Sequence, residues 1–291
     1  MTYNTVSELL SLAENSSSSL WEIIMENECT LSEVNRDVVF ERLAQRYQVM
    51  CRSAERALTE PLPSAGGLTD GISSAHYEFC VCSGGISGKF MNLVMARALS
   101  CSEVNAAMGK ICAAPTAGSC GILPAVLMTV AEKCGSSERE VLCALLTASG
   151  IGAIITKNAT VAGSEGGCQA ECGVAAAMAA AGAVHLYGGS NQMAVNSAGF
   201  ALINCMGLIC DPIAGLVEVP CAQRNASQAV NAIISADLAL AGMKSPVSCD
   251  EVIEAMYRTG KLLPPQLRET AQGGIAATPS GRKIAKQVFG R

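Results

Sequence analysis

Aromatic, charged and histidine residues are all scarce in this chain. Of its 291 residues only 4% are aromatic and 15% are charged, and histidine occurs twice. The apolar half of the sequence therefore consists mainly of alanine, valine, isoleucine, leucine and methionine, and small side chains let helices pack closely. This composition favours tightly packed helices over a β-sandwich. Two histidines are also too few for a histidine-rich metal site.

An excess of positive charge is missing as well. The formal net charge is −5 and no stretch forms a basic stripe, so we expect no nucleic-acid partner. Residues 1–15 lack the basic start and apolar stretch of a secretory signal. Residues 111–131 and 172–210 contain no charged side chain, but glycine, proline and polar residues interrupt both. Neither supplies the roughly 18 consecutive apolar residues of a membrane span, so we predict a cytoplasmic protein without a membrane partner.

Cysteine, in contrast, is abundant, with 15 residues. The odd number and the absence of an export signal argue against a disulfide framework, because the cytosol keeps thiols reduced. Most of these cysteines should be small buried hydrophobic residues, and a few are candidate metal ligands.

Helical periodicity runs through most of the chain. Capping boxes at Ser137 with Glu140 and at Ser248 with Glu251 open two helices, and Gly260 is expected just past the end of the second. Ser32 is expected to cap a long helix that ends near Thr59. The remaining predicted helices cover residues 6–13, 20–27, 90–99, 166–184, 191–208 and 222–241.

We therefore predict an all-α fold, a compact multi-helix catalytic domain with buried helices rich in small residues. Residues 62–89 contain glycine and serine throughout and predict a loop. A boundary in this region divides an N-terminal helical lead-in, residues 1–60, from a helical catalytic domain, residues 61–291. The two parts are expected to form one structural unit.

A first candidate site is the glycine-containing turn at residues 113–121, just before a helix led by Pro124. Backbone N–H groups at the start of a helix suit an anion such as a carboxylate, which makes Thr116 and Ser119 candidate substrate-binding residues. An ordinary turn that leads into a helix is the commoner explanation.

A second candidate site covers residues 156–172, where Lys157, Glu165 and Glu171 lie between long uncharged flanks. A charge in apolar surroundings is costly unless it is paired or functional. An exposed cation in a loop is an equally good interpretation of Lys157. Cys168 and Cys172 would share one face of a helix, although this spacing alone is weak support for metal ligands.

The third candidate site is residues 210–221, where two cysteines flank a turn with two prolines. A helix that starts behind Cys221 would lower the pKa of its thiol and favour the thiolate that binds iron. Two buried cysteines without a metal are an equally good interpretation.

Four strings together resemble the α chain of two-chain bacterial L-serine dehydratases. They are APTAGSCGILPAVL, SEGGCQAEC, CDPIAGLVEVPCAQRNA and EAMYRTGKLLPPQLRET, in that order along the chain. The resemblance implies a [4Fe–4S] cluster held by Cys168, Cys210 and Cys221, with one iron that lacks a cysteine. Such an iron can act as a Lewis acid on the hydroxyl of L-serine, which is converted to pyruvate and ammonia.

The resemblance also suggests roles for other residues. Lys157, Asn158 and Glu165 are the candidate catalytic residues, while Thr116 and Ser119 would bind the substrate. The family uses a smaller module with a Ser-Ser-Ser-His-Thr stretch, which this sequence lacks. We therefore expect a separate β subunit, which is a candidate source of the catalytic base.

Three alternatives stay open at this stage. One is a pyridoxal-phosphate deaminase with Lys157 as the Schiff-base lysine. Another is a non-catalytic helical subunit whose cysteines only fill the core. The last is a related lyase directed at cysteine or threonine.

Overall fold

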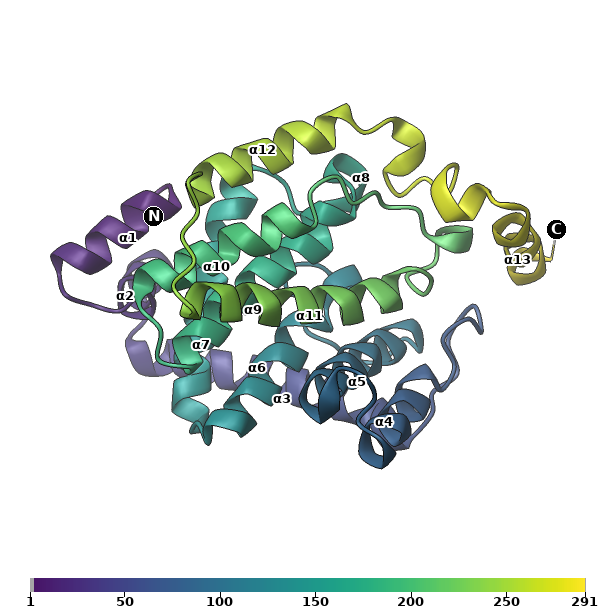
Figure 1. Cartoon of the computed structure of the whole chain (residues 1–291), viewed down its shortest axis with the longest axis horizontal. Helices are drawn as coiled ribbons and strands as arrows, with labels where there is room; N and C mark the ends of the chain where they lie inside the picture. The colour runs from purple at the N-terminus through teal and green to yellow at the C-terminus, as the bar shows by residue number, and fades with distance from the viewer. Residues whose placement is uncertain (1–2, 291) are drawn as a thin grey trace.

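Helices form nearly all of the regular structure in the computed structural model, which describes residues 3–290 (Figure 1). No β-strand occurs within these residues; Cys210 and Arg268 form an isolated β-bridge. The predicted all-α fold is thus confirmed. The α-helices are α1 (Val6–Asn15), α2 (Leu20–Ser32), α3 (Arg36–Thr59), α4 (Ile72–Cys82), α5 (Gly88–Ala106), α6 (Ile122–Cys134), α7 (Glu138–Asn158), α8 (Gly163–Gly166), α9 (Val174–Leu186), α10 (Asn191–Asn204), α11 (Cys221–Leu240), α12 (Cys249–Leu262) and α13 (Pro279–Phe289).

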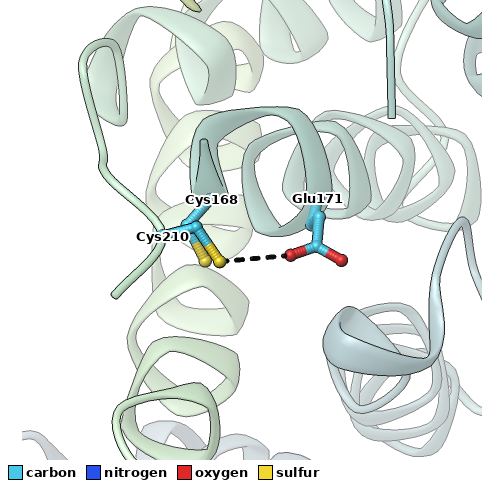
Figure 2. A group of neighbouring side chains, drawn as sticks. All are labelled: Cys168, Glu171 and Cys210. Atoms are coloured by element: carbon cyan, nitrogen blue, oxygen red, sulfur yellow. Dashed lines mark hydrogen bonds between the residues drawn. The ribbon is translucent and has the colours of Figure 1, made fainter. Parts of the chain in front are cut away.

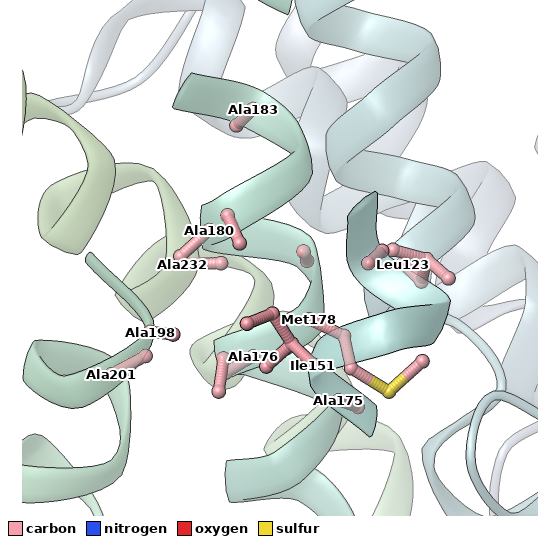
Figure 3. Packing of buried hydrophobic residues seen from close by; sticks show 14 of the residues in the cluster. Leu123, Ile151, Ala175, Ala176, Met178, Ala180, Ala183, Ala198, Ala201 and Ala232 are labelled. Carbon is pink, nitrogen blue, oxygen red and sulfur yellow. The ribbon is translucent and has the colours of Figure 1, made fainter. Parts of the chain in front are cut away.

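Helix α9 lies at the centre of the molecule. All residues from Val174 to Val184 are buried, and the helix packs against α6, α7, α10 and α11. Its sequence is mostly alanine and has no polar face, as expected for a helix surrounded by others. In Figure 3 the alanines of α9 lie among Ala198 and Ala201 of α10 and Ala232 of α11. The small side chains let the neighbouring helices come close.

The N-terminal helices share this core. Leu9, Met25 and Phe40, from α1, α2 and α3, belong to the same hydrophobic cluster as the residues of α9. The Asp250 carboxylate of α12 accepts hydrogen bonds from the backbone N–H groups of Val6 and Ser7, at 2.7 and 2.9 Å. The proposed division near residue 60 stays a prediction.

Both predicted capping boxes are present, at Ser137 with Glu140 and at Ser248 with Glu251. The expected cap at Ser32 is wrong. Ser32 is the last residue of α2, which ends at the left-handed Glu33, and Asn35 caps α3 by accepting a hydrogen bond from the Val38 N–H. The helix is therefore capped by Asn35, three residues after the predicted cap.

The prediction of a loop across residues 62–89 is also wrong in part, because α4 forms within it. This helix packs along α5, where Ser73 Oγ donates to the Ala96 carbonyl at 3.1 Å and Cys80 is buried. Gly260 does not end α12 but lies inside it. A Cβ atom there would lie 2.7 Å from Gly166 Cα, so the glycine serves the close packing of α12 on α8.

Two further helices are shorter than predicted. The region 166–184 is interrupted by Gly167, whose φ is +75°, and by the π-helix η2 (Gln169–Gly173) before α9 begins. Helix α10 ends at Asn204 rather than near residue 208.

By length and apolar composition, one described helix could cross a membrane. This is α7, and 72% of its most apolar window is buried within the protein. The core helices of globular proteins often pass the same test, so α7 gives only weak support for a membrane span.

The close contact between α5 and α6 generates a test of the packing. A Cβ atom at Gly121 would lie well inside 3.0 Å of the Ala98 carbonyl oxygen, and a backbone atom cannot move aside cheaply. Gly121→Ala should lower the free energy of unfolding by about 1–3 kcal/mol in chemical denaturation.

Gly199→Ala in α10 is the matched control. Its new methyl group would meet Cys249 at no less than 3.8 Å, and alanine favours a helix, so stability should stay equal or rise by up to about 1 kcal/mol. Equal effects of the two substitutions would contradict this description of the packing.

Candidate functional site

The polypeptide turns sharply just before the central helix. After Gly167, Cys168 precedes the π-helix η2, which continues directly into α9. The buried Gln169 side chain fixes this turn. Its Nε2 donates to the carbonyls of Gly166 and Met256, at 2.9 and 3.0 Å, and its Oε1 accepts from the Gly207 N–H at 2.8 Å. One side chain thus joins the turn to α12 and to the loop that carries Cys210.

Two cysteines and a carboxylate meet at this turn. The atoms of Cys168, Glu171 and Cys210 that could bind a metal, two sulfurs and a carboxylate oxygen, all lie within 4.8 Å of one another. We call these three residues the cysteine–carboxylate group. Figure 2 shows the two sulfur atoms side by side, with the Glu171 carboxylate on the same side of the turn. Cys210 Sγ is 3.9 Å from Glu171 Oε2, and Cys172 Sγ lies 3.6 Å from Cys168 Sγ.

Cys210 is held by the C-terminal part of the chain. Its N–H donates to the Leu267 carbonyl at 2.9 Å, and its carbonyl accepts from the Glu269 N–H at 2.7 Å. The neighbouring Asp211 is buried and accepts from the Ile275 N–H at 2.7 Å. The position of this thiol therefore depends on residues 265–277.

Cys221 is the first residue of α11 and is buried. Burial, together with the charges of Cys168 and Glu171, raises the pKa of its thiol to about 12. Cys221 is not one of the three residues whose ligand atoms lie within 4.8 Å of one another, although the charges of Cys168 and Glu171 act on its thiol. Burial outweighs the lowering of its pKa that was expected from the helix start.

Cys168 has the opposite tendency. Its hydrogen-bonding contacts with the thiols of Cys172 and Cys210 hold the pKa of Cys168 well below the ordinary value, and the Arg224 guanidinium acts in the same direction. Arg224 also donates to the Ile209 carbonyl at 2.8 Å and to Asp211 at 2.6 Å. The group thus contains a sulfur poised as a thiolate next to protonated thiols, whose protons a metal would displace on binding.

Glu171 links this group to the first candidate site. Its Oε1 accepts a hydrogen bond from Thr116 Oγ1 at 2.9 Å. Burial raises the pKa of this carboxyl to about 7, and the negative charge of Cys168 contributes to the rise. Two glycines leave room for it, since Cβ atoms at Gly163 and Gly118 would lie 2.6 and 3.2 Å from its oxygens.

The two predicted substrate-binding residues lie together at this point. Thr116 Oγ1 and Ser119 Oγ are 3.1 Å apart across the turn η1 (Ala117–Ser119). Asn225 of α11 holds this turn by donating to the Gly118 carbonyl at 2.7 Å and accepting from the Gly121 N–H at 2.9 Å. The Gly121 N–H is therefore occupied within the chain, which limits the backbone donors expected here for an anion.

The three predicted catalytic residues have different surroundings. Lys157 and Asn158, exposed at the end of α7, donate to the side chain and the carbonyl of Asn4 respectively. Glu165 is exposed on the short helix α8. The structure does not place these side chains among the contacts of the cysteine–carboxylate group, and their catalytic roles stay predictions.

Sequence reasoning placed Glu171 within the second candidate site but gave it no role, and it did not select Arg224 or Asp211. Glu171 had a usable signal, since it is one of three charges between long uncharged flanks. Asp211 follows Cys210 directly and Arg224 lies three residues after Cys221. Opposite charges beside both cysteines are compatible with a buried ion pair, but their sequence spacing does not establish one.

Known proteins resemble this chain over nearly its full length. Residues 15–276 match the family described as serine dehydratase alpha chain. A probable L-serine dehydratase alpha chain from Bacillus subtilis is 40% identical over 99% of this chain and 96% of its own length. The L-serine dehydratase alpha chain of Peptoniphilus asaccharolyticus is 44% identical over 98% of both chains. L-serine dehydratase TdcG of Escherichia coli is 40% identical over 94% of this chain, which spans 61% of that protein.

An all-helical fold with a cysteine–carboxylate group at the start of its central helix defines a candidate metal-binding subunit. The match over residues 15–276 is more specific. The chain belongs to the serine dehydratase alpha chain family, as its sequence motifs indicated.

The raised pKa of Glu171 predicts a pH-dependent stability of the metal-free chain. Because the folded pKa is about 7 and the ordinary value is 4.5, the folded state binds the extra proton between these values. The associated stabilisation is complete below pH 4.5 and is lost as the pH rises through 7. Relative to Glu171→Gln, the free energy of unfolding should fall by about 3 kcal/mol between pH 4.5 and 8.

Denaturant titrations of both proteins across this pH range measure the difference, in which the other titrating groups largely cancel. Glu14→Gln, at an exposed position in α1, serves as the control and should follow the unmodified chain. A constant difference between the unmodified chain and Glu171→Gln would mean that Glu171 titrates as an ordinary carboxylate.

Proposed function

We propose that this chain is the cluster-binding catalytic subunit of an L-serine dehydratase, which converts L-serine to pyruvate and ammonia. The observation that carries the proposal is the cysteine–carboxylate group, in a chain of the serine dehydratase alpha chain family. Relatives named L-serine dehydratase support the substrate. A lyase that acts on threonine or cysteine is a variant of the same proposal.

The residues present fit an iron–sulfur cluster as the cofactor. We assign Cys168, Cys210 and Cys221 as the ligands of a [4Fe–4S] cluster. Cysteine thiolates are the usual ligands of such clusters. Cys168 is already biased towards the thiolate, Cys210 adjoins it and Cys221 is within its electrostatic range. When bound, a cluster with three cysteine ligands supplies one open iron as a Lewis acid for the departing hydroxyl.

The chain's own residues would prepare the site for this chemistry. Thr116 and Ser119 stay the candidate substrate-binding residues; the Thr116 side chain is partly exposed, whereas Ser119 is fully buried beneath it and would act through the Thr116 hydroxyl. Arg224 and Asp211 fix the loop between Cys210 and Cys221, and Gln169 fixes the turn that carries Cys168. Lys157, Asn158 and Glu165 stay candidate catalytic residues, each of which would require a rearrangement or a partner to reach the substrate.

A β subunit is the proposed partner and a candidate source of the base that removes the α-proton. Glu218 lies in the loop from Cys210 to Cys221, and its carboxylate is buried. It accepts hydrogen bonds from Ser64 Oγ at 2.8 Å and from the Gly66 and Leu68 N–H groups at 2.6 and 2.9 Å. This contact joins residues 64–68 to the loop that runs from Cys210 to Cys221. A second chain docked there would exclude water.

Other features agree with this assignment. Each of the fifteen cysteines, all within the described residues, is a free thiol, which suits a reducing compartment such as the cytoplasm. Lys157 lies on the surface with Asn4 as its partner, so no observation favours a pyridoxal-phosphate enzyme.

Removal of a ligand thiol tests the cluster assignment. Cys168→Ser, Cys210→Ser and Cys221→Ser should each abolish serine deamination and lower the iron and sulfide content after anaerobic reconstitution, because serine binds iron more weakly than a thiolate. Circular dichroism should show that the variants still fold.

Cys29→Ser, Cys51→Ser and the exposed Cys134→Ser are the controls. They should retain full iron content and activity. An unmodified chain that stays colourless and free of iron after reconstitution would favour a non-catalytic subunit whose cysteines only fill the core.

Dependence on a β subunit is the second test. The reconstituted α chain alone should turn over serine about 10²-fold or more slowly than the pair, because a missing general base costs at least this much. Pyruvate formation is measured with and without a β chain that carries the serine–histidine stretch. Equal rates in the two assays would show that this chain supplies the complete catalytic machinery.

A further inference from the structure

A substrate that is a free amino acid presents an ammonium group, which can donate three hydrogen bonds and carries a positive charge. A buried site that binds it needs hydrogen-bond acceptors and, for a strong interaction, a carboxylate. Selection against a similar molecule without the ammonium depends on the same acceptors, because they lose their partner when it is absent.

Glu171 is the carboxylate in the cysteine–carboxylate group. One of its oxygens is 3.9 Å from Cys210 Sγ, and the other accepts the Thr116 hydroxyl at 2.9 Å. Its carboxylate therefore lies next to the proposed ligand thiols, as Figure 2 shows, and also contacts the Thr116 hydroxyl. Glu269 is near enough to influence the same groups, but its side chain is exposed.

The Thr116 and Ser119 hydroxyls each have one proton, and each donates it within the chain. Thr116 donates its single proton to Glu171, which in its ionised form can only accept. Ser119 Oγ, 3.1 Å from Thr116 Oγ1, has one proton of its own, which it can donate to that oxygen or to the Thr116 carbonyl at 3.5 Å. The remaining lone pairs of Thr116 and Glu171 form an acceptor-rich surface. Such a surface suits an ammonium group and not the carboxylate that sequence reasoning assigned to Thr116 and Ser119.

We propose that Glu171, with the Thr116 hydroxyl that it orders, binds the α-ammonium group of the amino-acid substrate. This inference rests on the proposed function. It gives Glu171 a role in substrate recognition, in addition to the three cysteines that hold the cluster. Glycine at positions 118 and 163 is part of the same arrangement, because a Cβ atom at either would press on the carboxylate.

The test compares L-serine with 3-hydroxypropionate, which keeps the hydroxyl and the carboxylate but lacks the ammonium. Glu171→Gln is measured in the cluster-loaded α chain assembled with its β chain. The KM for L-serine should rise about tenfold or more, as expected for the loss of a charge-assisted hydrogen bond. The inhibition constant of 3-hydroxypropionate should change less than about twofold, since it never used that contact.

Thr116→Val should raise the KM for L-serine in the same selective way, and Thr116→Ser, which keeps the hydroxyl, should restore it. Glu269→Gln is the matched control, and its selectivity should stay close to that of the unmodified enzyme. Iron and sulfide content must be unchanged in Glu171→Gln. Loss of iron from this variant, equal weakening of both ligands, or a selective defect in Glu269→Gln instead would overturn the proposal.

These measurements test the proposed function and the role of Glu171 separately. If the unmodified pair neither holds iron nor forms pyruvate, the proposed function is wrong. If that pair is active and Glu171→Gln binds L-serine normally, only the assignment of Glu171 is wrong.

Discussion

Burial of α9 from Val174 to Val184 is the constraint on which both the fold and the site depend. A helix of small apolar residues, surrounded by four others, can carry no charge along its length without a large desolvation cost. The polar chemistry therefore gathers at its N-terminal end, in the π-helix of residues 169–173. Such widened turns are frequent at functional sites, and here the turn places Cys168 and Glu171 beside Cys210.

The site contains buried charge that stability alone would not select. Arg224 and Asp211 form a largely buried ion pair, and such pairs often contribute less than apolar residues of similar volume. Asp211 also holds the Gly274–Ile275 turn, where a Cβ atom on Gly274 would overlap the carboxylate. The pair thus couples the position of the loop from Cys210 to Cys221 to the C-terminal segment. A group of this kind is expected where function outweighs stability.

Much of the architecture followed from local sequence signals. The two capping boxes and the apolar composition of residues 174–184 identified helices that the structure contains. Errors arose where contacts between distant residues determine the structure. Gly260, for example, was expected to end α12 but lies inside it, because it packs on Gly166. Helix α4 was missed because its packing against α5 outweighs the glycine- and serine-rich composition of its surroundings. The same contrast between local signals and distant contacts holds for the side chains at the site. Spacing could not rank fifteen cysteines, and the proximity of Cys168 to Cys210 is a property of the tertiary fold.

The central claim is that the chain holds a cluster with one iron open to the substrate. Mössbauer spectroscopy of the anaerobically loaded protein, assembled with its β chain and enriched in ⁵⁷Fe, tests it most directly. Addition of L-serine should shift the signal of about one iron in four and leave the others unchanged, because only the iron without a thiolate can take a new ligand. A spectrum that L-serine leaves unaltered, in a protein that converts it to pyruvate, would contradict the account.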